Sequence, residues 1–319
     1  MCGVMGWYRV RKMTNDGALL VDELMRAIEA RGRDAAGVSV QVVGTAAEAV
    51  KHHVRATDFV KLNEYKKLRE RFKDANCIIG HSRAATHGDK RENDNNHPHW
   101  TENMKHVLVH NGIVSGASSW LWDMCNSECD SETILRAVEA LGVEAAFRET
   151  MSWDYSDMTV LLQERGTETM YFWRNDGRPL VGVNASKTAG GWLFVSTEHL
   201  LRKAWIRVVR KGIPVSAIWE AEPFVLYKMS PGDRKPQAVM EIPEEERPGD
   251  PPVHQSSASC HRVCRDSNYP VYNRQTYTSI CDKWRGIEPW WERQAREDME
   301  SLLADDFDEN GNYAPGRNK

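Results

Sequence analysis

Apolar residues recur at helical spacing in two parts of the chain. The segment 17–31 places three of them at i, i+4 and i+8, on one face of an amphipathic helix: Leu20, Leu24 and Ile28. Gly32 follows as a C-terminal stop. The segment 131–142 shows a similar period, and Asp130 or Ser131 is placed to cap its first turn. The pattern predicts helices over both segments.

Shorter apolar runs, several of them rich in β-branched and aromatic residues, predict strands. They lie at 2–10, 36–44, 76–82, 106–112, 157–164, 169–175, 180–184 and 192–197. The strands come in groups separated by only a few helices. This order favours an α+β fold in which antiparallel sheets are layered with helices, over a parallel sheet built from βαβ units.

The composition changes after about residue 231. The next stretch is rich in Pro, Glu and Ser and lacks an apolar period, which is typical of a linker or a disordered segment. A short helix is possible at 287–304. The sequence therefore predicts a folded domain over 2–231, followed by a linker and tail over 232–319.

Composition and charge narrow the function classes. The 319 residues suffice for a sizeable core, and 42 Lys and Arg against 46 Asp and Glu give a formal net charge of −4. That balance does not indicate a nucleic-acid partner. No apolar run reaches the roughly 20 residues that span a membrane, and no secretory signal is recognisable at the start. The seven cysteines are odd in number and irregularly spaced, so we expect a reducing, cytoplasmic setting rather than a disulfide framework.

The first candidate for chemistry is Cys2, directly behind the initiator methionine. Removal of Met1 would give one residue both a thiol and a free α-amino group. An α-amine has a pKa near 7.7–8.0, roughly, so it can serve as a general base at neutral pH. The alternative is an incidental cysteine at a frayed terminus.

A polar segment at 80–100 follows a predicted strand and concentrates potential ligands: His81, Arg83, Thr86, His87, His97 and His99. The guanidinium of Arg83 offers a planar fork for a carboxylate. A rival interpretation takes His87, His97 and His99, with Asp89 or Asp94, as metal ligands. Their spacing matches no common zinc pattern, so we predict no metal here. A plain polar surface loop is the third possibility.

Two further motifs admit a local and a functional interpretation. Asn111 and Gly112 form a turn signal after a strand, but a side-chain amide and a backbone N–H side by side also suit an oxyanion hole. Asp130 is a candidate helix N-cap, or alternatively a carboxylate that receives a substrate ammonium group.

The order of these motifs resembles the class II glutamine amidotransferases, whose glutaminase domains carry an N-terminal cysteine nucleophile. The resemblance is nearest to the glutaminase half of glucosamine-phosphate synthase and to amidophosphoribosyltransferase, and it covers about residues 2–230. It rests on the Cys-Gly start, "RGRDAAG", "GHSRAATHG", "NNHPH", "VHNGIV" and "DSET". The segments "RNDGRPL" at 174–180 and "FVSTEHLL" at 194–201 look like that family's later strands.

The resemblance implies a four-layer αββα sandwich and a hydrolysis of the glutamine side-chain amide through a thioester to Cys2, without a cofactor. It assigns the oxyanion hole to Asn111 and Gly112. It also implies a pocket for free L-glutamine whose binding residues are Arg83 for the α-carboxylate, Asp130 for the α-ammonium, and Thr86 and His87 along the wall. Arg31 and Gly32 match a motif that supports the nucleophile.

The chain also departs from the family. Ala84 stands where the synthase has a tryptophan, which leaves the closure of the pocket open. No sugar-isomerase domain, phosphoribosyl-pyrophosphate motif or synthetase pyrophosphate loop is recognisable. We therefore expect a free-standing glutaminase domain that passes ammonia to a separate synthase or ligase.

The tail offers two weaker signals. Three tryptophans are possible docking anchors for such a partner: Trp284, Trp290 and Trp291. Five residues are loosely spaced candidates for zinc: His254, Cys260, His261, Cys264 and Cys281.

Two other functions remain open at this point. One is a γ-glutamyl amide hydrolase that transfers no nitrogen. The other is a glutamine-binding module without turnover.

Overall fold

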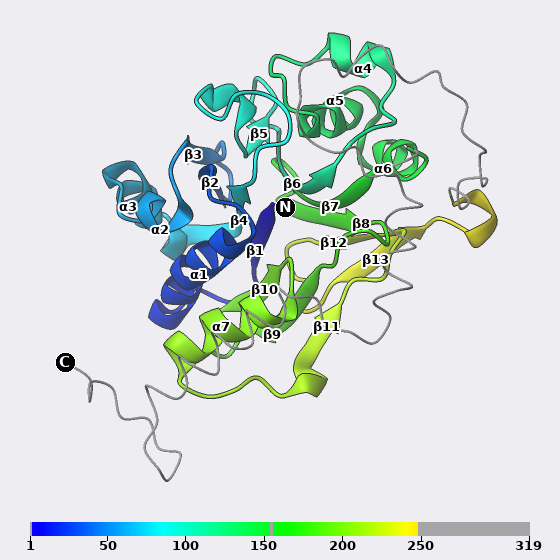
Figure 1. The fold of residues 1–319 in the computed structure, drawn as a ribbon. Helices are drawn as coiled ribbons and strands as arrows, with labels where there is room; N and C mark the ends of the chain where they lie inside the picture. The colour runs from blue at the N-terminus through cyan, green and yellow to red at the C-terminus, as the bar shows by residue number, and fades with distance from the viewer. Residues whose placement is uncertain (1, 154–155, 248–319) are drawn as a thin grey trace, which may run out of the picture. The chain divides into compact units, whose positions relative to one another are not determined.

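Two antiparallel sheets form the centre of the molecule in the computed structural model, which describes residues 2–153 and 156–247 (Figure 1). The first sheet has the order β11-β9-β10-β1-β4-β2-β3 and the second the order β13-β12-β8-β7-β6-β5. The strands of the first are β1 (Gly3–Arg9), β2 (Ala35–Val42), β3 (Glu48–His52), β4 (Ala75–Arg83), β9 (Val181–Ala185), β10 (Gly191–Val195) and β11 (Ile218–Glu220). Those of the second are β5 (His99–Trp100), β6 (His106–Ile113), β7 (Asp157–Glu164), β8 (Thr169–Arg174), β12 (Val225–Met229) and β13 (Gln237–Glu241).

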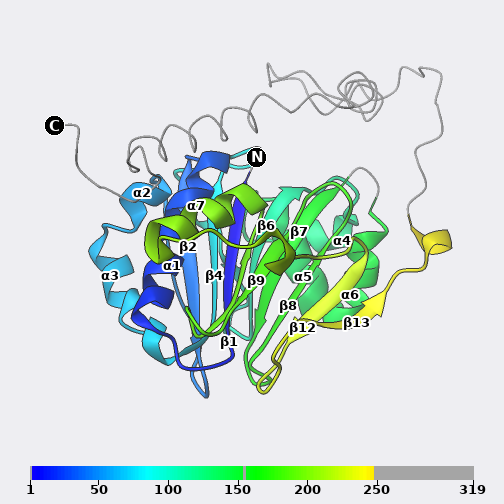
Figure 2. The same cartoon turned by 90° about the horizontal axis from the view of Figure 1, so that it is seen from below.

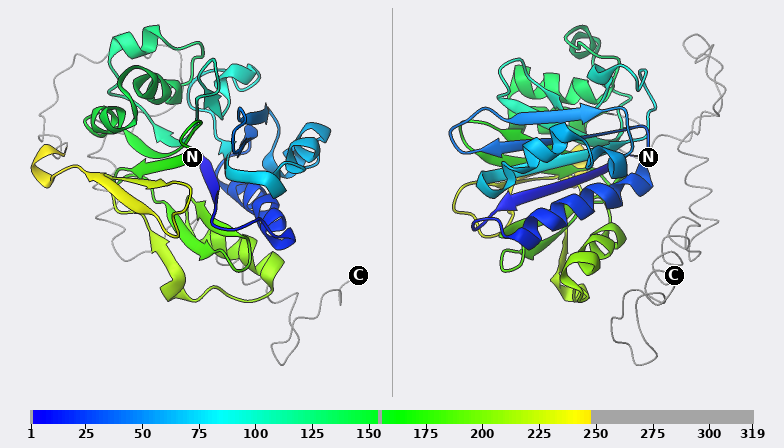
Figure 3. Two further views of the ribbon diagram at one scale, coloured as in Figure 1. Left: turned by 180° about the vertical axis from the view of Figure 1, so that it is seen from behind. Right: turned by 90° about the vertical axis from the view of Figure 1, so that its left-hand side faces the viewer.

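Helices cover the outer face of each sheet, as the views along the layers show (Figures 2 and 3). The first sheet is covered by α1 (Asn15–Ile28), α2 (Ala56–Phe59), α3 (Asn63–Arg69) and α7 (Glu198–Val209). The second is covered by α4 (Ser119–Asp123), α5 (Ser131–Leu141) and α6 (Val143–Met151). The predicted α+β sandwich of four αββα layers is therefore confirmed.

The alternation of side chains along β1 explains why two sheets stack here. Met5 and Trp7 point into the core beneath the helices, whereas Val4 and Tyr8 belong to the core between the sheets. Successive side chains of a strand point to opposite faces, so a strand that is apolar on both faces must be covered on both. Gly6 shares the face toward the second sheet, and a Cβ there would lie 3.2 Å from Leu161.

Both predicted helices are present, with small shifts at their ends. Helix α1 begins after Thr14, whose hydroxyl accepts the backbone N–H of Gly17, and a 3₁₀ turn at Glu29–Arg31 follows it. Helix α5 begins after Asp130 and ends at Leu141. Its C-cap is Gly142, whose φ of +81° suits a residue without a side chain. The period of the apolar residues thus located both helices correctly.

Three segments differ from the sequence-based expectation. Strand β13 lies inside the stretch predicted to be a linker, and it pairs with β12. The segment 194–201 is not all strand, because β10 ends at Val195 and α7 begins at Glu198. In the segment 174–180, Arg174 ends β8, and residues 175–180 form the connection to β9 rather than a strand.

The expectations for the tail, namely a helix at 287–304, docking tryptophans and zinc ligands, lie outside the described residues. Within the described ones, no helix is both long and apolar enough to cross a membrane.

Candidate active site

Cys2 lies at the start of β1, beside the end of β4. Antiparallel pairing of Gly3 with Ser82 brings the cysteine next to Ala84, whose backbone N–H points to Sγ at an N–S distance of 3.4 Å. Arg31 donates from Nε to the Cys2 carbonyl oxygen at 2.8 Å. The backbone around the nucleophile candidate is therefore held from two sides.

Glycines permit these close approaches. A Cβ on Gly3 would lie 2.8 Å from the backbone oxygen of Ile28, and one on Gly32 would lie 2.3 Å from the carbonyl carbon of Arg83. Neither position has room for a larger residue. Within the "RGRDAAG" motif, Arg31 thus contacts Cys2 and Gly32 lies against Arg83.

The surroundings of the Cys2 thiol have opposing effects on its pKa. Burial raises the pKa above the ordinary value of 9.0, and Asp130 adds to this. The Ala84 N–H, the positive chain terminus and Arg83 act in the opposite direction, but the net shift is upward. A thiol in this state is protonated at neutral pH and needs a base before it can attack.

Asn111 is fully buried near the end of β6, and neither polar atom of its side chain has a hydrogen-bond partner. Gly112 follows with a φ of +156°, and a Cβ there would lie 1.7 Å from the Asp157 carbonyl oxygen. Buried amides in proteins nearly always have partners, so the side chain of Asn111 is available to hydrogen-bond with a group that enters an adjacent space.

One cavity of about 60 Å³ joins four of the predicted site residues with three others. It is lined by Cys2, Ala84, Thr86, Asn111, Gly112, Ile113 and Arg178. This volume is several times the roughly 10–15 Å³ that one water molecule needs. The nucleophile candidate and both oxyanion-hole candidates thus border the same small space.

Arg83 does not border that cavity. Its Nη1 donates to Asn96 Oδ1 at 2.9 Å, and its Nη2 donates to the carbonyl oxygens of His87 and Gly88. In this arrangement the guanidinium ties together the segment that follows β4. A carboxylate that approached Nη2 would compete with these two carbonyl oxygens.

Asp130 caps the first turn of α5, as its position predicts, and makes a second contact with the segment after β6. Its carboxylate accepts the N–H of Ser131 at 3.0 Å, as an N-cap of α5, and the N–H of Val114 at 2.7 Å. The half-exposed His87 ring lies 3.8 Å from the same carboxylate. Both residues therefore lie beside the segment after β6 without bordering the cavity.

Arg178 is a charged cavity residue that was not among the predicted site residues. It lies in the connection between β8 and β9 and forms an ion pair with Asp157 at 3.0 Å. Its Nε is buried and has no partner. The signal was present in the "RNDGRPL" motif, but that motif was interpreted as part of a strand.

The metal ligands considered at 87–99 do not gather as a set. Asp89 pairs with Arg91, and His87 faces Asp130. His97 and His99 are buried together, with Cys129 as their third neighbour.

Comparison with known proteins supports the family resemblance. The chain is 31% identical over 233 residues to glutamine–fructose-6-phosphate aminotransferase (isomerizing) of Bacillus thuringiensis subsp. konkukian, covering 67% of this chain and 37% of the relative. The same enzyme of Halalkalibacterium halodurans is 29% identical over 194 residues, which is 57% of this chain and 30% of that one. The chain thus spans about a third of the length of these curated relatives. No protein-family model matches it.

A solved structure agrees on the fold. Glutamine phosphoribosylpyrophosphate amidotransferase of B. subtilis superposes with a TM-score of 0.55 at 18% identity, over 75% of this chain and 49% of that chain. The four-layer fold is therefore shared with this amidotransferase. The chain contains a class II glutamine amidotransferase domain, related to the glutaminase domains of the two enzymes named above.

Proposed function

We propose that this protein hydrolyses the side-chain amide of L-glutamine through a thioester on Cys2 and delivers the ammonia to a separate synthase or ligase. The observation that carries the proposal is the buried Asn111 amide without a partner, which borders the same cavity as Cys2. The family relationship supplies the reaction class, and the geometry supports the roles of these two residues.

In the proposed reaction, removal of Met1 frees the α-amine of Cys2, which takes the proton from the thiol. Sγ attacks the amide carbon, and the oxygen of the tetrahedral intermediate receives hydrogen bonds from the Asn111 amide and the Gly112 N–H. The amine then gives its proton to the departing ammonia, and a thioester remains. Water, deprotonated by the same amine, cleaves the thioester and releases glutamate.

The two charged ends of glutamine have candidate partners outside the cavity. Arg83 is proposed for the α-carboxylate and Asp130 for the α-ammonium, with Thr86 and His87 on the wall between them. Because Arg83 bonds the carbonyl oxygens of residues 87 and 88, glutamine binding is expected to rearrange this segment. Ala84 lacks the large side chain that closes the pocket of the synthase, so less of the substrate would be covered at that position.

An ammonia-release assay with purified full-length protein tests the proposal. We expect glutamate and ammonia in equal amounts from glutamine, with Cys2→Ala inactive but folded by circular dichroism. Cys77→Ala is a control for loss of a thiol, because Cys77 is buried between the sheets and does not border the cavity. The proposal is wrong if Cys2→Ala keeps full activity, or if γ-glutamyl amides are turned over faster than glutamine.

The nitrogen acceptor is addressed by a second experiment. A pull-down with the Cys2→Ala variant should retain a synthase or ligase, and adding that enzyme to wild-type protein should convert free ammonia release into product formation. If no retained enzyme changes the release of free ammonia, the protein is a glutaminase that transfers no nitrogen.

A further inference from the structure

Three buried side chains with metal-ligating atoms meet outside the cavity. They are His97, His99 and Cys129, each exposed by 4% or less. One ligand atom from each lies within 4.8 Å of the other two. The histidines flank the start of β5, and the cysteine lies in the turn before α5, so the set joins two separate segments.

Three of the four ring nitrogens of these histidines are buried without a partner. These atoms are Nδ1 and Nε2 of His97 and Nε2 of His99, and none of them has a hydrogen bond. The rings do contact other rings: His97 stacks on His81 with centroids 3.9 Å apart, and His99 meets His97 edge-on at 4.5 Å. Stacking uses the faces of the imidazole, whereas its nitrogen lone pairs lie in the ring plane. The packing therefore does not satisfy them.

We propose that His97, His99 and Cys129 form a binding site for a thiophilic d¹⁰ metal ion, held by two neutral imidazoles and one thiolate. Soft thiolate ligands combined with imidazole favour copper and zinc among the biological metals. On binding, the Cys129 S–H bond breaks, its proton goes to solvent, and the sulfur electron pair forms the metal bond. No electron transfer is involved.

The geometry requires only a small contraction. Metal–nitrogen bonds of about 2.0–2.1 Å and metal–sulfur bonds of about 2.3 Å place trigonal ligand atoms about 3.5–3.8 Å apart. The present separations of up to 4.8 Å exceed this by about 1 Å. Rotation of the side chains can supply a shift of that size.

The local charges favour a monovalent ion. Lys51 and Arg83 both bond Asn96, the residue next to His97, and thus bring two positive charges to this region. The carboxylate of Asp130, whose Oδ1 lies 3.8 Å from Cys129 Sγ, brings one negative charge. Asp94 and Glu132 act on Lys51, and Arg136 acts on His99, so the positive and negative charges of the region nearly balance. A Cu⁺ ion with one thiolate adds no net charge, whereas Zn²⁺ with one thiolate adds a buried positive charge. Since burying an uncompensated charge is costly, Cu⁺ is the better fit.

Such an ion would connect two segments that the proposed reaction uses. Asn96, next to His97, holds the guanidinium of Arg83, and Asp130 directly follows Cys129. Bound metal would therefore fix the groups proposed for the two ends of glutamine. This consequence rests on the proposed function, but the metal site itself does not.

The test uses full-length, reduced, chelator-washed protein. Cu⁺ is titrated in competition with a chromophoric chelator, Zn²⁺ is titrated in parallel, and bound metal is counted after desalting. We expect about one Cu⁺ per chain in wild type, bound more tightly than Zn²⁺, and more than tenfold weaker binding in Cys129→Ser and in His99→Gln. These readouts do not depend on glutaminase activity, so failure of one proposal is distinguishable from failure of the other.

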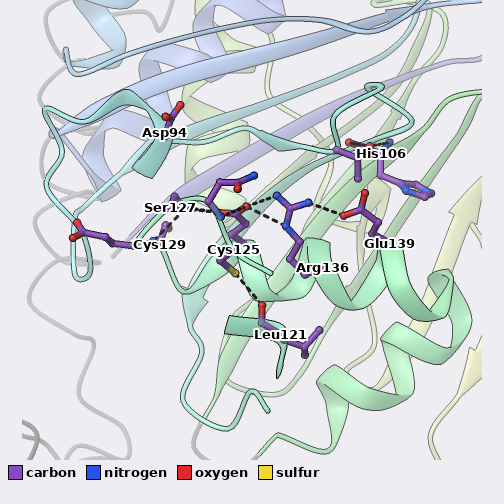
Figure 4. A network of polar contacts seen from close by, with 12 residues as sticks. Asp94, His106, Leu121, Cys125, Ser127, Cys129, Arg136 and Glu139 are labelled. Carbon is purple, nitrogen blue, oxygen red and sulfur yellow. Dashed lines mark hydrogen bonds and ion pairs between the residues drawn. The ribbon is translucent and has the colours of Figure 1, made fainter. Parts of the chain in front are cut away.

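Two control variants separate this site from other thiols. Cys125→Ser removes a nearby thiol that donates to the Leu121 carbonyl oxygen at 3.3 Å and is not part of the set (Figure 4). The double variant Cys260→Ser, Cys264→Ser removes two cysteines of the tail. Both should keep the copper. Copper retained by Cys129→Ser, or lost in the tail variant, overturns the site, and tighter binding of Zn²⁺ overturns the choice of ion. If His99→Gln does not fold, the nearly isosteric Cys129→Ser variant still tests whether the site binds copper.

Discussion

The Sγ atom of Cys2 lies 3.4 Å from the backbone nitrogen of Ala84, the residue directly after Arg83. This contact stabilises a thiolate, yet burial outweighs it and the pKa of the thiol is raised. The resting nucleophile candidate is therefore a neutral thiol. In the proposed reaction, it is the amine exposed by removal of Met1 that makes it reactive.

This relationship predicts how alkylation of Cys2 depends on pH. In protein that retains Met1, the rate of modification by iodoacetamide should rise about tenfold per pH unit from 7 to 9, because the thiolate fraction grows in that proportion below the pKa. Protein that lacks Met1 should react faster at pH 7, because the amine then stands on the same residue. Peptide mass spectrometry measures both rates. A plateau below pH 8, or identical profiles for the two forms, contradicts the prediction.

The orphaned amide of Asn111 predicts a kinetic effect rather than a binding effect. Asn111→Ala should lower kcat about 10²–10³-fold and change KM little, because the lost hydrogen bond forms only as negative charge develops on the substrate oxygen. Ile113 borders the same cavity and has no proposed role in the reaction, so Ile113→Val should retain most of kcat and is the matched control. A change confined to KM in Asn111→Ala would argue against an oxyanion hole.

The contact between Arg31 and the Cys2 backbone predicts that Arg31 positions the nucleophile without touching the substrate. Its Nε holds the Cys2 carbonyl oxygen at 2.8 Å, a bond that lysine cannot make with the same geometry. Arg31→Lys should lower kcat about tenfold, the equivalent of roughly 1.4 kcal/mol, with KM nearly unchanged. Arg33→Lys alters an exposed neighbour and should be neutral. Equal losses in both variants would show that the effect is not specific to the Cys2 contact.

Local patterns explain most of the sheets and two of the helices. The period of two along β1 and the period near 3.6 in α1 each reflect burial of one side of one element, and such patterns are visible in the sequence itself. Strand β13 is different, because Gln237–Glu241 is half-polar and becomes a strand only by pairing with β12. Helix α7 carried its own apolar period at Leu200, Leu201 and Ala204, which the interpretation as strand overlooked.

The residues of the candidate site also fall into two groups: those identifiable from a local motif and those whose contacts depend on the fold. Cys2 and Asn111 are identifiable from their motifs, and the fold places them on one cavity. The present role of Arg83, which bonds two carbonyl oxygens of the following segment, depends on how that segment folds back. The contact of Arg178 with Asp157 joins positions 21 residues apart, and no local sequence pattern predicts it. Long-range contacts of this kind are what the sequence alone cannot supply.

The last prediction concerns the segment that leads into α5. The Glu132 carboxylate, whose side chain is 5% exposed, accepts hydrogen bonds from the N–H groups of Asn126 and Ser127, the Ser127 hydroxyl and the guanidinium of Arg136. Burial alone would raise the pKa of Glu132, but these hydrogen bonds lower it overall. The carboxylate is therefore more stable in the folded state than in the unfolded state.

Glu132→Gln should lower the free energy of unfolding by about 3 kcal/mol at pH 7, because the buried Arg136 loses its buried anionic partner. Glu139 also bonds Arg136 but is 37% exposed, so Glu139→Gln should cost less than about 1 kcal/mol. Since the pKa of Glu132 is lower in the folded state, its contribution is complete above the unfolded pKa of about 4.3 and is lost as the pH falls through the folded pKa. Urea denaturation of wild type and both variants between pH 3 and pH 7 should show the difference for Glu132→Gln shrinking toward acid. A difference that stays constant over this range, or equal losses in the two variants, would show that Glu132 does not hold this segment as a carboxylate.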